Sequence, residues 1–417
     1  MHKRYTLDIM QESSRYAVGI DVGTTAVRCV VARIDEETGK PSVVGLGKSS
    51  NRGMRKGTVV DLSGPAEAID NALGEAERMS GYQIDEACLS VNGSHIVSTH
   101  VDGMVAVGDG GHEITHEDVL RVEEVATMGK IPPNREVLDV IPHAYKLDGQ
   151  DNIRDPIGMT GTRLEIDAHV VSALTPHVNN LQHAAESAKV QPSSIVLAGV
   201  ASARAVLSEE QKENGVALVD IGGATTNVAV YEEGDLRYAA VVPMGGINIT
   251  NDLAIGLKTD PSIAEKIKIK HASAVVRSEN SGVSLKHDGE ILSFNTEEID
   301  DIVEARLEEI FEAVEKELKR AGRAGRLPGG IVLTGGTSNL SHIDDYAKRA
   351  LGLAARVGKT TGFKSVVDDI EGPEYAAALG LMLFDSESHG TSGKKKDNKQ
   401  KQKGSNPLAK FVSRFRV

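Results

Sequence analysis

The chain is poor in cysteine and in aromatic side chains, and it has no tryptophan. Its 417 residues include two cysteines, six phenylalanines and eight tyrosines. Cys29 lies in a valine-rich run and Cys88 in "DEACLSV", so we expect two small buried thiols in a reducing cytosol and no disulfide framework. The scarcity of aromatic rings excludes the stacking platforms of proteins that bind single-stranded nucleic acid.

Long apolar runs are also absent. No segment approaches the roughly 20 apolar residues that cross a bilayer, and the first fifteen residues lack the apolar core of a signal peptide. We therefore expect a protein that is neither exported nor membrane-spanning. A chain of 417 residues is too long for one compact core, so it should divide into two or more domains.

Charge is distributed unevenly. The formal net charge is -13, but residues 386–417 hold nine Lys or Arg against two acids, a charge of +7. The first 385 residues therefore carry a charge of -20. Such an acidic body argues against nucleic acid as a partner, and it leaves the basic C-terminal segment to be explained.

The most informative feature is an internal repeat. Residues 17–33, "AVGIDVGTTAVRCVVAR", read as two strands joined by a tight glycine-containing turn. Residues 215–243, "GVALVDIGGATTNVAVYEEGDLRYAAVVP", repeat that plan and add a third strand. A repeat at this separation predicts two related domains, each of which opens with a β-hairpin.

The turns of both hairpins are suited to phosphate, because glycine lets backbone N–H groups approach phosphate oxygens closely. Asp21 and Asp220 precede the turns, where two carboxylates could hold Mg²⁺ through its waters. Arg28 could reach back as a counter-charge. Either turn alone could be an ordinary hairpin turn, but the pair, together with "LTGGTS" at residues 333–338, favours a polyphosphate ligand.

Other segments predict further elements. Between the repeats, a helix capped by Thr115, with Asp118 three residues on, has strands on both sides, which gives a strand-helix-strand-strand insert. "VASARAVLSEEQKEN" reads as one helix, and residues 247–325 read as mainly helical. The long helix in "TEEIDDIVEARLEEIFEAVEKELKRAG" should be amphipathic. Its apolar side would carry Ile299, Ile302, Val303, Leu307, Ile310 and Val314.

Five motifs together resemble one superfamily. "GIDVGTTAVRCVV", "VALVDIGGATTNVAV" and "IVLTGGTSNL" are similar to the phosphate-1, phosphate-2 and adenosine motifs of actin, sugar kinases and heat-shock chaperones. "VASARAVL" and "EYAAALGLM" match the two connecting helices, so the resemblance runs from about Ala17 to Phe384. It implies an α/β, actin-like fold in which two ribonuclease-H-like domains close over a nucleotide, with ATP and Mg²⁺ as cofactors.

The resemblance also implies a set of nucleotide contacts. "AEKIKIKHA" matches the superfamily's adenosine contact at Glu265 and Lys268; the alternative is a surface ion pair three residues apart. The implied contacts are Asp21, Gly23, Thr24, Thr25, Arg28, Asp220, Gly222, Gly223, Ala224, Thr225, Thr226, Gly245, Gly246, Glu265, Lys268, Gly335, Gly336 and Thr337, of which Asp21 and Asp220 would hold Mg²⁺.

The insert resembles one branch of the superfamily. "GSHI", "IPPNREVLDVIPHAYKLDGQ" and "DPIGMTGTRLE" are similar to the strand-helix-strand-strand subdomain of the FtsA family, the actin-like bacterial cell-division proteins. The alternatives are a pilus-assembly scaffold of the same fold and a small-molecule kinase, for which no general base is evident.

The motifs predict the following division of the chain. The expected segments are an N-terminal tail (1–14), a first ribonuclease-H-like domain (15–83 with 167–205), the insert (84–166), a second such domain (206–246 with 327–384), a helical subdomain (247–326), a disordered basic linker (385–406) and an amphipathic membrane-targeting helix (407–417).

The last eleven residues, "PLAKFVSRFRV", have an apolar and a cationic side. At 100° per residue, Leu408, Phe411, Val412 and Phe415 share one face, and Lys410, Arg414 and Arg416 lie outside it. Such a peptide is too short to span a bilayer, but it can lie in the headgroup region of an anionic membrane. The alternative is a frayed tail. The lysines of the linker could be a solvated spacer or could assist membrane binding.

Membership of the FtsA family would imply further properties. These are actin-like filaments of the protein itself and the tethering of FtsZ to the cytoplasmic face of the cell membrane at the division site, as a peripheral membrane protein. The helical subdomain would contact the C-terminal tail of FtsZ at Arg306 and Glu309, and the insert would contact later division proteins. Arg306 and Glu309 could also be merely solvated. Hydrolysis is doubtful, because the water-orienting position falls on Ala198 or Gly199, although Asp220 is a candidate for slow turnover.

Overall fold

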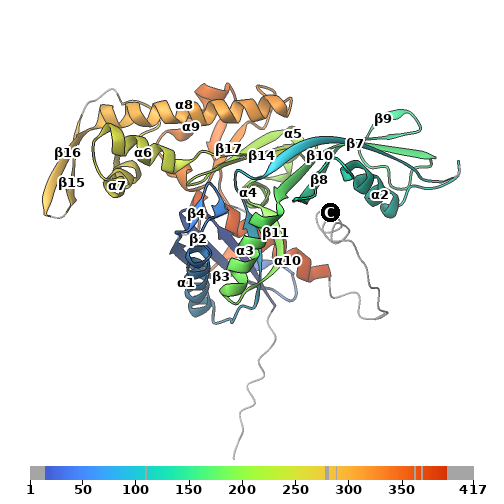
Figure 1. The fold of residues 1–417 in the computed structure, drawn as a ribbon, viewed down its shortest axis with the longest axis horizontal. Helices are drawn as coiled ribbons and strands as arrows, with labels where there is room; N and C mark the ends of the chain where they lie inside the picture. Colours follow the sequence, from blue (N-terminus) through green and yellow to red (C-terminus); the bar gives the residue numbers. More distant parts are fainter. Residues whose placement is uncertain are drawn as a thin grey trace, which may run out of the picture.

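The computed structural model describes residues 15–108, 110–277, 281–287, 289–360, 363–367 and 370–391. Two sheets occupy the middle of the molecule, and two smaller parts extend from it to opposite sides (Figure 1). One of these parts is the insert, and the other is the mainly helical subdomain. The predicted α/β organisation, with an insert and a helical subdomain, is confirmed.

The first sheet has six strands in the order β11-β6-β1-β2-β3-β19. They are β1 (Tyr16–Val22), β2 (Ala26–Ile34), β3 (Pro41–Ser50), β6 (Glu86–Val91), β11 (Gln191–Leu197) and β19 (Lys364–Ser365). The first three form an antiparallel meander, and β6 and β11 extend the sheet in parallel beside β1. Both faces of this sheet are covered, so β1 and β2 are nearly continuous apolar runs.

The second sheet repeats this topology with five strands, in the order β14-β13-β12-β17-β18. They are β12 (Val216–Ile221), β13 (Thr226–Glu232), β14 (Asp235–Val242), β17 (Ile331–Thr334) and β18 (Ala355–Val357). An antiparallel meander is again continued by parallel strands. The two hairpins predicted from the repeat are therefore present.

Two helices cross between the sheets. α10 (Ala376–Thr391) packs on β1 and β6, and α4 (Ala198–Val206) packs on β12 and β13. A Cβ at Gly380 would lie 1.7 Å from the carbonyl oxygen of Ala201, so only glycine allows these helices to approach so closely. The same apolar cluster contains residues from both helices and both sheets, and it joins the two domains.

Helices α1 (Ser63–Ser80) and α3 (Thr175–Ser187) belong to the first domain, where α1 packs on β2 and β3 and α3 on β11. Cys29 and Cys88 are fully buried, as expected, and they are not joined in a disulfide. The segment expected to be one helix after β11 is two helices, α4 and α5 (Glu209–Asn214). Ser208 starts the second one because its hydroxyl accepts a hydrogen bond from the Gln211 N–H in a capping box.

The insert is a four-stranded sheet, β7-β10-β8-β9, with one helix. Its elements are β7 (Val97–Ala106), α2 (His116–Thr127), β8 (Arg135–Leu147), β9 (Gln150–Ile153) and β10 (Arg163–Leu174). The predicted cap is confirmed, since Thr115 and Asp118 form a reciprocal capping box at the start of α2.

The expected limits of the insert, 84 and 166, need correction. β6 pairs in parallel with β1 and β11 and is therefore a strand of the first domain. β10 continues in the insert's sheet as far as Leu174. An isolated apolar strand followed by turn residues does not indicate which sheet it joins, and this explains the error.

The helical subdomain contains α6 (Gly246–Gly256), α7 (Pro261–His271) and α8 (Thr296–Arg320), and α9 (Ile343–Leu351) packs beside α8. The amphipathic prediction for α8 is confirmed, because all of the six named apolar residues except Ile302 are fully buried. The expectation of a mainly helical segment missed one hairpin, β15 (Gly282–His287) and β16 (Glu290–Asn295), which forms the far end of the subdomain in Figure 1.

The end of the second domain also differs from expectation. Residues 327–384 were assigned to it, yet β19 pairs with β3 of the first sheet and α10 packs on β1. The expected start of the linker at residue 385 needs correction, because α10 continues to Thr391. Asp385 is buried within that helix, where it accepts hydrogen bonds from the Val18 N–H and the Ser193 hydroxyl.

The two predicted tails, residues 1–14 and the lipid-binding segment 407–417, lie outside the described residues. No helix in the described part of the chain combines the length and the apolar character needed to cross a bilayer.

Candidate functional site

The two hairpin turns have the same backbone geometry. The Gly23 N–H donates to the Ala26 carbonyl oxygen at 3.1 Å, and the Gly222 N–H donates to that of Thr225 at 2.9 Å. The tips face each other, since a Cβ at Gly223 would lie 2.6 Å from Thr25 Cγ2. The two turns therefore meet between the domains.

Polar side chains also join the two halves beside these turns. Asn92, which follows β6, donates from its amide nitrogen to the hydroxyl of Thr225 at 2.9 Å. Thr24 accepts a hydrogen bond from the Gly57 N–H in the small hairpin β4 (Met54–Arg55) and β5 (Thr58–Val59). These contacts fix the positions of both turns relative to the first domain.

Asp21 lies at the end of β1, opposite Arg28 on β2. Its Oδ1 accepts a hydrogen bond from the Ser90 hydroxyl at 2.8 Å, and Ser90 Oγ in turn accepts one from the Val22 N–H. Burial raises the pKa of the Asp21 carboxyl, while Arg28 and Ser90 act in the opposite direction. The ionised form is therefore supported by one cation and one hydroxyl.

Asp220 occupies the equivalent position on β12, but Asn227 lies opposite it. Its Oδ2 accepts from the Ser202 hydroxyl at 2.9 Å and lies 3.5 Å from Asn227 Nδ2. Burial, together with repulsion from Asp21, raises the pKa of Asp220 to about 7. The two carboxylates are therefore close enough to repel each other, and the single positive charge of Arg28 does not neutralise both.

This pair fits a magnesium ion that is held through waters. Hard divalent cations prefer carboxylate and water oxygens, and Mg²⁺ commonly keeps several of its waters. Among the described residues, no group of three or more His, Cys, Asp or Glu side chains is arranged to hold a metal ion directly. Two carboxylates on facing hairpins, with water and phosphate oxygens as the other ligands, are consistent with that mode of binding.

Two further glycine turns pack against the second hairpin. The Gly246 N–H, at the start of α6, donates to the Gly222 carbonyl oxygen at 3.0 Å, and the Thr337 hydroxyl donates to the same oxygen at 2.9 Å. Gly335 has a φ of +85°, and a Cβ there would lie 2.3 Å from Asp220 Oδ1. Glycine is needed at this position both for the turn and for the approach to the carboxylate.

Glu265 and Lys268 form an ion pair on α7, with 2.7 Å between Nζ and Oε2. The lysine is more than a surface partner, because its side chain is only 13% exposed and its Nζ also donates to the Gly246 carbonyl oxygen at 3.0 Å. The predicted pair is therefore held at the start of α6, beside the turns.

Arg28 extends toward the start of α10. Its Cζ lies 5.6 Å from the centroid of the Tyr375 ring, and its Nε has no hydrogen-bond partner among the described residues. Burial raises the pKa of the Glu374 carboxyl, but a hydrogen bond from Asn339 and the charge of Arg28 bring it below its usual value. Arg28 thus lies among three acids and retains an unused donor.

The beginning of α4 bears on hydrolysis. Ala198 and Gly199 are buried there and offer no polar side chain. A Cβ at Gly199 would lie 2.8 Å from Cβ of Asn227, so the packing leaves little space for a larger residue. Within the described part of the chain, this position therefore has no group to orient an attacking water.

Four residues of the site were not identified from the sequence: Ser90, Asn92, Ser202 and Asn227. Ser90 and Asn92 lie at the end of β6, the strand that was assigned to the insert. Small polar residues at the carboxyl end of a buried strand were the available signal.

Arg306 and Glu309 lie on α8, in the helical subdomain away from the hairpins (Figure 1). Arg306 pairs with both oxygens of Asp252 on α6 and with Glu309, and these contacts, chiefly those with Asp252, raise the pKa of its guanidinium. Its side chain is only 21% exposed, so it is not merely solvated, whereas that of Glu309 is 59% exposed.

Two domains of equal topology that meet through glycine turns define an actin-like fold, and solved structures agree. The chain resembles the PilM–PilN type IV pilus biogenesis complex, with a TM-score of 0.65 and 16% identity over 89% of this chain and 98% of that one. It also resembles MreB5 of Spiroplasma citri bound to ADP, with a TM-score of 0.55 and 14% identity over 91% and 99% of the two chains. At these identities the likeness establishes the fold only.

The sequence comparisons identify the particular family. The family model "Cell division protein FtsA" matches residues 217–380, and "SHS2 domain inserted in FTSA" matches residues 93–172. The chain is 35% identical to FtsA of Pseudomonas aeruginosa over 377 residues, 89% of this chain and 90% of that protein. It is 32% identical to FtsA of Escherichia coli strain K12 over 386 residues, covering 90% and 91%. The chain therefore belongs to the FtsA family of cell-division proteins, as its motifs predicted.

Proposed function

We propose that this cell-division protein binds Mg-ATP between its two domains, assembles into actin-like filaments and tethers FtsZ filaments to the cytoplasmic face of the cell membrane at the division site. The observation that carries the nucleotide proposal is the pair Asp21 and Asp220. They come from equivalent strands of two homologous hairpins, and each is followed by a glycine turn. Repulsion between them is relieved when a cation lies between them.

Each part of the site has a proposed role. The N–H groups of Thr24 and Thr25 in the first turn, and of Gly223 and Ala224 in the second, bind phosphate oxygens, and Arg28 supplies positive charge. Asp21 and Asp220 hold Mg²⁺ through waters, and the ion neutralises phosphate charge. Glu265 and Lys268, with the turn at residues 335–337, would hold the adenosine. Turnover would be slow, since Ala198 and Gly199 cannot orient a water.

The nucleotide proposal is tested by titrating Mg-ATP into Asp220→Ala and into an exposed control, Asp301→Ala on α8, by calorimetry. Loss of one magnesium anchor should weaken binding by about tenfold or more in Asp220→Ala, because its charged contacts are worth roughly 1.5–3 kcal/mol. Asp301→Ala should bind as the unmodified protein does. Equal ATP affinity in all three proteins would refute the site.

The FtsZ contact is proposed at Arg306 and Glu309. Arg306→Glu places a negative charge against Asp252 and Glu309 and should abolish binding of an FtsZ tail peptide. Since Arg306 also joins α8 to α6, Glu309→Lys is the better-controlled change, because it reverses an exposed charge and leaves the Asp252 pair intact. Glu298→Lys, at an exposed position in the first turn of the same helix, makes the same change in net charge and is the matched control. Peptide binding by Glu309→Lys equal to that of Glu298→Lys would place the contact elsewhere.

Membrane attachment is proposed for residues 407–417. Phe411→Glu should release the protein from anionic liposomes by placing a charge on the apolar side of the peptide. Ser413→Glu, which adds the same charge off that side, should be retained more strongly. Sedimentation of both variants with vesicles to the same extent would contradict an amphipathic helix.

Filament formation is supported by the MamK structure, a double helical filament of the same fold, at a TM-score of 0.51.

A further inference from the structure

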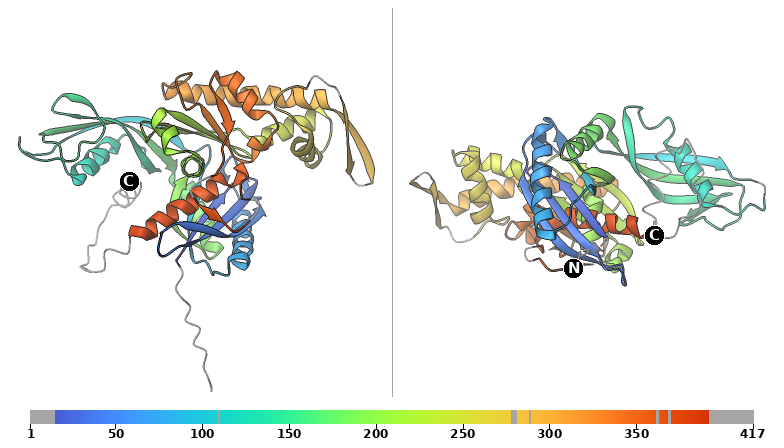
Figure 2. Two further views of the ribbon diagram at one scale, coloured as in Figure 1. Left: turned by 180° about the vertical axis from the view of Figure 1, so that it is seen from behind. Right: turned by 90° about the horizontal axis from the view of Figure 1, so that it is seen from below.

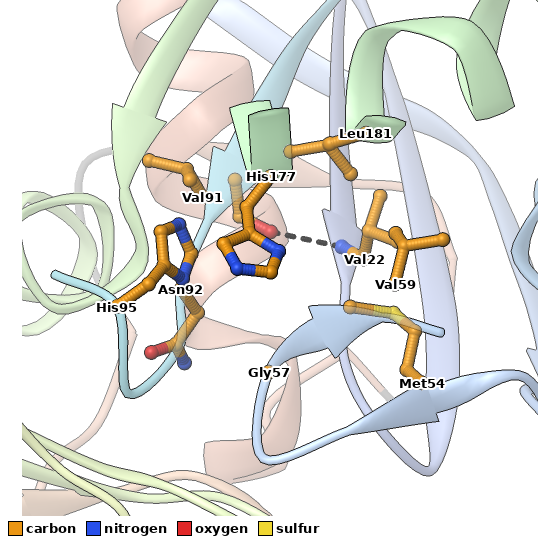
Figure 3. Close-up of a pocket in the computed structure, with 10 residues that line it drawn as sticks. Val22, Met54, Gly57, Val59, Val91, Asn92, His95, His177 and Leu181 are labelled. Carbon is orange, nitrogen blue, oxygen red and sulfur yellow. Dashed lines mark hydrogen bonds between the residues drawn. The ribbon is translucent and has the colours of Figure 1, made fainter. Parts of the chain in front are cut away.

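A small pocket lies in the first domain, next to the end of β1. Val22 of β1, Gly57 and Ser90 line it, together with two histidines. His95 lies in the loop that leads from β6 into the insert, and His177 lies in the first turn of α3. Figure 3 shows the two rings facing each other across the pocket, and their centroids are 4.7 Å apart.

The ring nitrogens of these histidines are buried without partners. His95 is 7% exposed, and neither its Nδ1 nor its Nε2 has a hydrogen-bond partner among the described residues; His177 Nδ1 has none either. Arg135 contacts the carbonyl oxygen of His95 rather than its ring. A buried polar group without a partner costs roughly 1–3 kcal/mol, so three such nitrogens in one pocket indicate a missing ligand.

The atoms without partners are all imidazole nitrogens. A neutral imidazole has one N–H donor and one nitrogen with a free lone pair, so each ring can give an electron pair to a ligand. No charged side chain lines the pocket to occupy that lone pair. A ligand that accepts an electron pair from each ring would satisfy both.

The spacing of the rings suits a single metal ion. Zinc binds imidazole nitrogen at about 2.0–2.1 Å, which puts a ring centroid about 3.2 Å from the ion, and two rings at tetrahedral angles are then about 5 Å apart. The observed 4.7 Å is close to this value. No Asp or Glu lines the pocket, so it offers little to Mg²⁺ or Ca²⁺, whereas imidazole suits Zn²⁺, Cu²⁺ and Ni²⁺.

We propose that His95 and His177 form a binding site for a transition-metal cation of the zinc class. Two imidazoles leave two positions of a tetrahedral ion for water. The guanidinium of Arg135 donates to the His95 carbonyl oxygen and repels a cation, so the affinity should be lower than that of a site with three or four protein ligands. The pocket adjoins the proposed nucleotide site, because Ser90 lines it and also donates to Asp21, but neither histidine is among the proposed nucleotide contacts.

The position of the site gives the metal a structural consequence. The ion would join the loop 92–95 to α3, and Asn92 in that loop bonds to Thr225 of the second hairpin. Gly57, which also lines the pocket, donates to Thr24 of the first turn. A bound metal would therefore restrain the loop that contacts both turns, and the apparent stability of the protein should rise with metal concentration.

The test is titration of the full chain with Zn²⁺, without nucleotide or Mg²⁺, followed by thermal unfolding and by diffraction from a zinc-soaked crystal. His177→Gln removes one ligand, and His183→Gln, an exposed position on the same helix, is the matched control. His100, His143 and His169 lie near one another outside this pocket, so all titrations use a His169→Gln background to exclude any zinc uptake by these rings.

Zn²⁺ should raise the unfolding temperature of the background protein and of His183→Gln. In His177→Gln the affinity should fall by at least about tenfold, since even changes to groups behind the ligands cost about 10–100-fold. An anomalous scattering peak between the two rings would confirm the site. Equal zinc affinity in His177→Gln and His183→Gln, or a zinc-soaked crystal with only water between the rings, would overturn the proposal.

Discussion

The hairpins β1–β2 and β12–β13 share a backbone but differ in charge. In the first, Asp21 faces Arg28 across the strand pair; in the second, Asp220 faces the neutral Asn227. Burial raises the pKa of both carboxyls, but Asp220, which also lies against Asp21, reaches about 7. The two domains therefore repeat the same hairpin backbone but not the same charges. Asp21 has a cation, Arg28, opposite it, whereas the ionised form of Asp220 would be stabilised by an added cation.

The two halves also differ in where they carry their additional parts. In the first, the insert follows β6, the fourth strand of the domain; in the second, α6, α7 and α8 precede β17, which is the fourth strand there. Figure 2 shows that the two parts extend in opposite directions from behind and from below as well. The shared core thus tolerates insertion at two places without any change in the hairpins that face each other.

The largest effect is expected where the two halves join. Gly380→Ala would put a methyl group 1.7 Å from the Ala201 carbonyl oxygen, and α10 and α4 would have to separate. The free energy of unfolding should fall by about 3 kcal/mol or more, as measured by urea unfolding.

Gly74→Ala on α1 is the matched control. A Cβ there would meet nothing closer than Arg78 Nη1 at 3.8 Å, so the helix should gain about 0.5–1 kcal/mol. Similar losses of stability in both variants would show that the crossing of α10 and α4 is not the tight contact between the halves.

The next effect concerns the two carboxylates. An acid with a raised pKa keeps its proton in the folded state between about pH 4 and its folded pKa, so stability falls as pH rises through that window. For Asp220 the window ends near pH 7. Asp220→Asn should therefore make the nucleotide-free protein about 1–3 kcal/mol more stable at pH 7.5 and should flatten its stability between pH 4 and 7.

Asp21→Asn sharpens this comparison, because it removes the carboxylate that faces Arg28 and leaves that cation without its partner. Asp21→Asn should raise the unfolding temperature of the protein less than Asp220→Asn does, when both are measured as a function of pH without Mg²⁺. An equal gain from both substitutions would mean that Arg28 does not distinguish the two halves.

A smaller effect is expected from the charge that distinguishes the hairpins. If Arg28 supplies a charge-assisted hydrogen bond to phosphate, Arg28→Gln should weaken Mg-ATP binding by about tenfold, as measured by calorimetry. The effect should also diminish at high salt. Arg33→Gln on the same strand, an exposed position, should leave the affinity unchanged. Equal affinities of the two variants would remove Arg28 from the phosphate site.

The smallest effect is local to the insert. Thr115→Ala removes the cap of α2 and should cost about 1 kcal/mol. Although burial raises it, hydrogen bonds from Thr115 and His112 lower the pKa of Asp118 to about 2, so its contribution should be lost only as pH falls from about 4 through 2. Hydrogen exchange should accelerate in α2 alone, whereas Ser208→Ala, at the matching capping box of the second half, should affect only α5. If either substitution accelerated hydrogen exchange equally in α2 and α5, the two helices would not unfold independently of each other.

Local patterns were sufficient for much of the fold. Both hairpins, the Thr115 cap and the buried side of α8 followed from turn residues and periodicity, because each depends on neighbours along the chain. The hairpin β15–β16 was not predicted from the sequence, because the segments on both sides of it have clear helical patterns and few of its own side chains are buried. The extension of α10 was missed because Asp385 looks like a linker residue until its partners on β1 and β11 are known.

The sequence by itself determined the repeat, the order of the elements and the carboxylates that end β1 and β12, because strand patterns and glycine turns are read from adjacent residues. Only the tertiary structure decided that β6 joins the first sheet, that Ser90 and Ser202 support the two carboxylates, and that His95 meets His177. The physical reason is that pKa shifts and unpaired nitrogens arise from burial and from contacts between distant segments, and no local pattern records either.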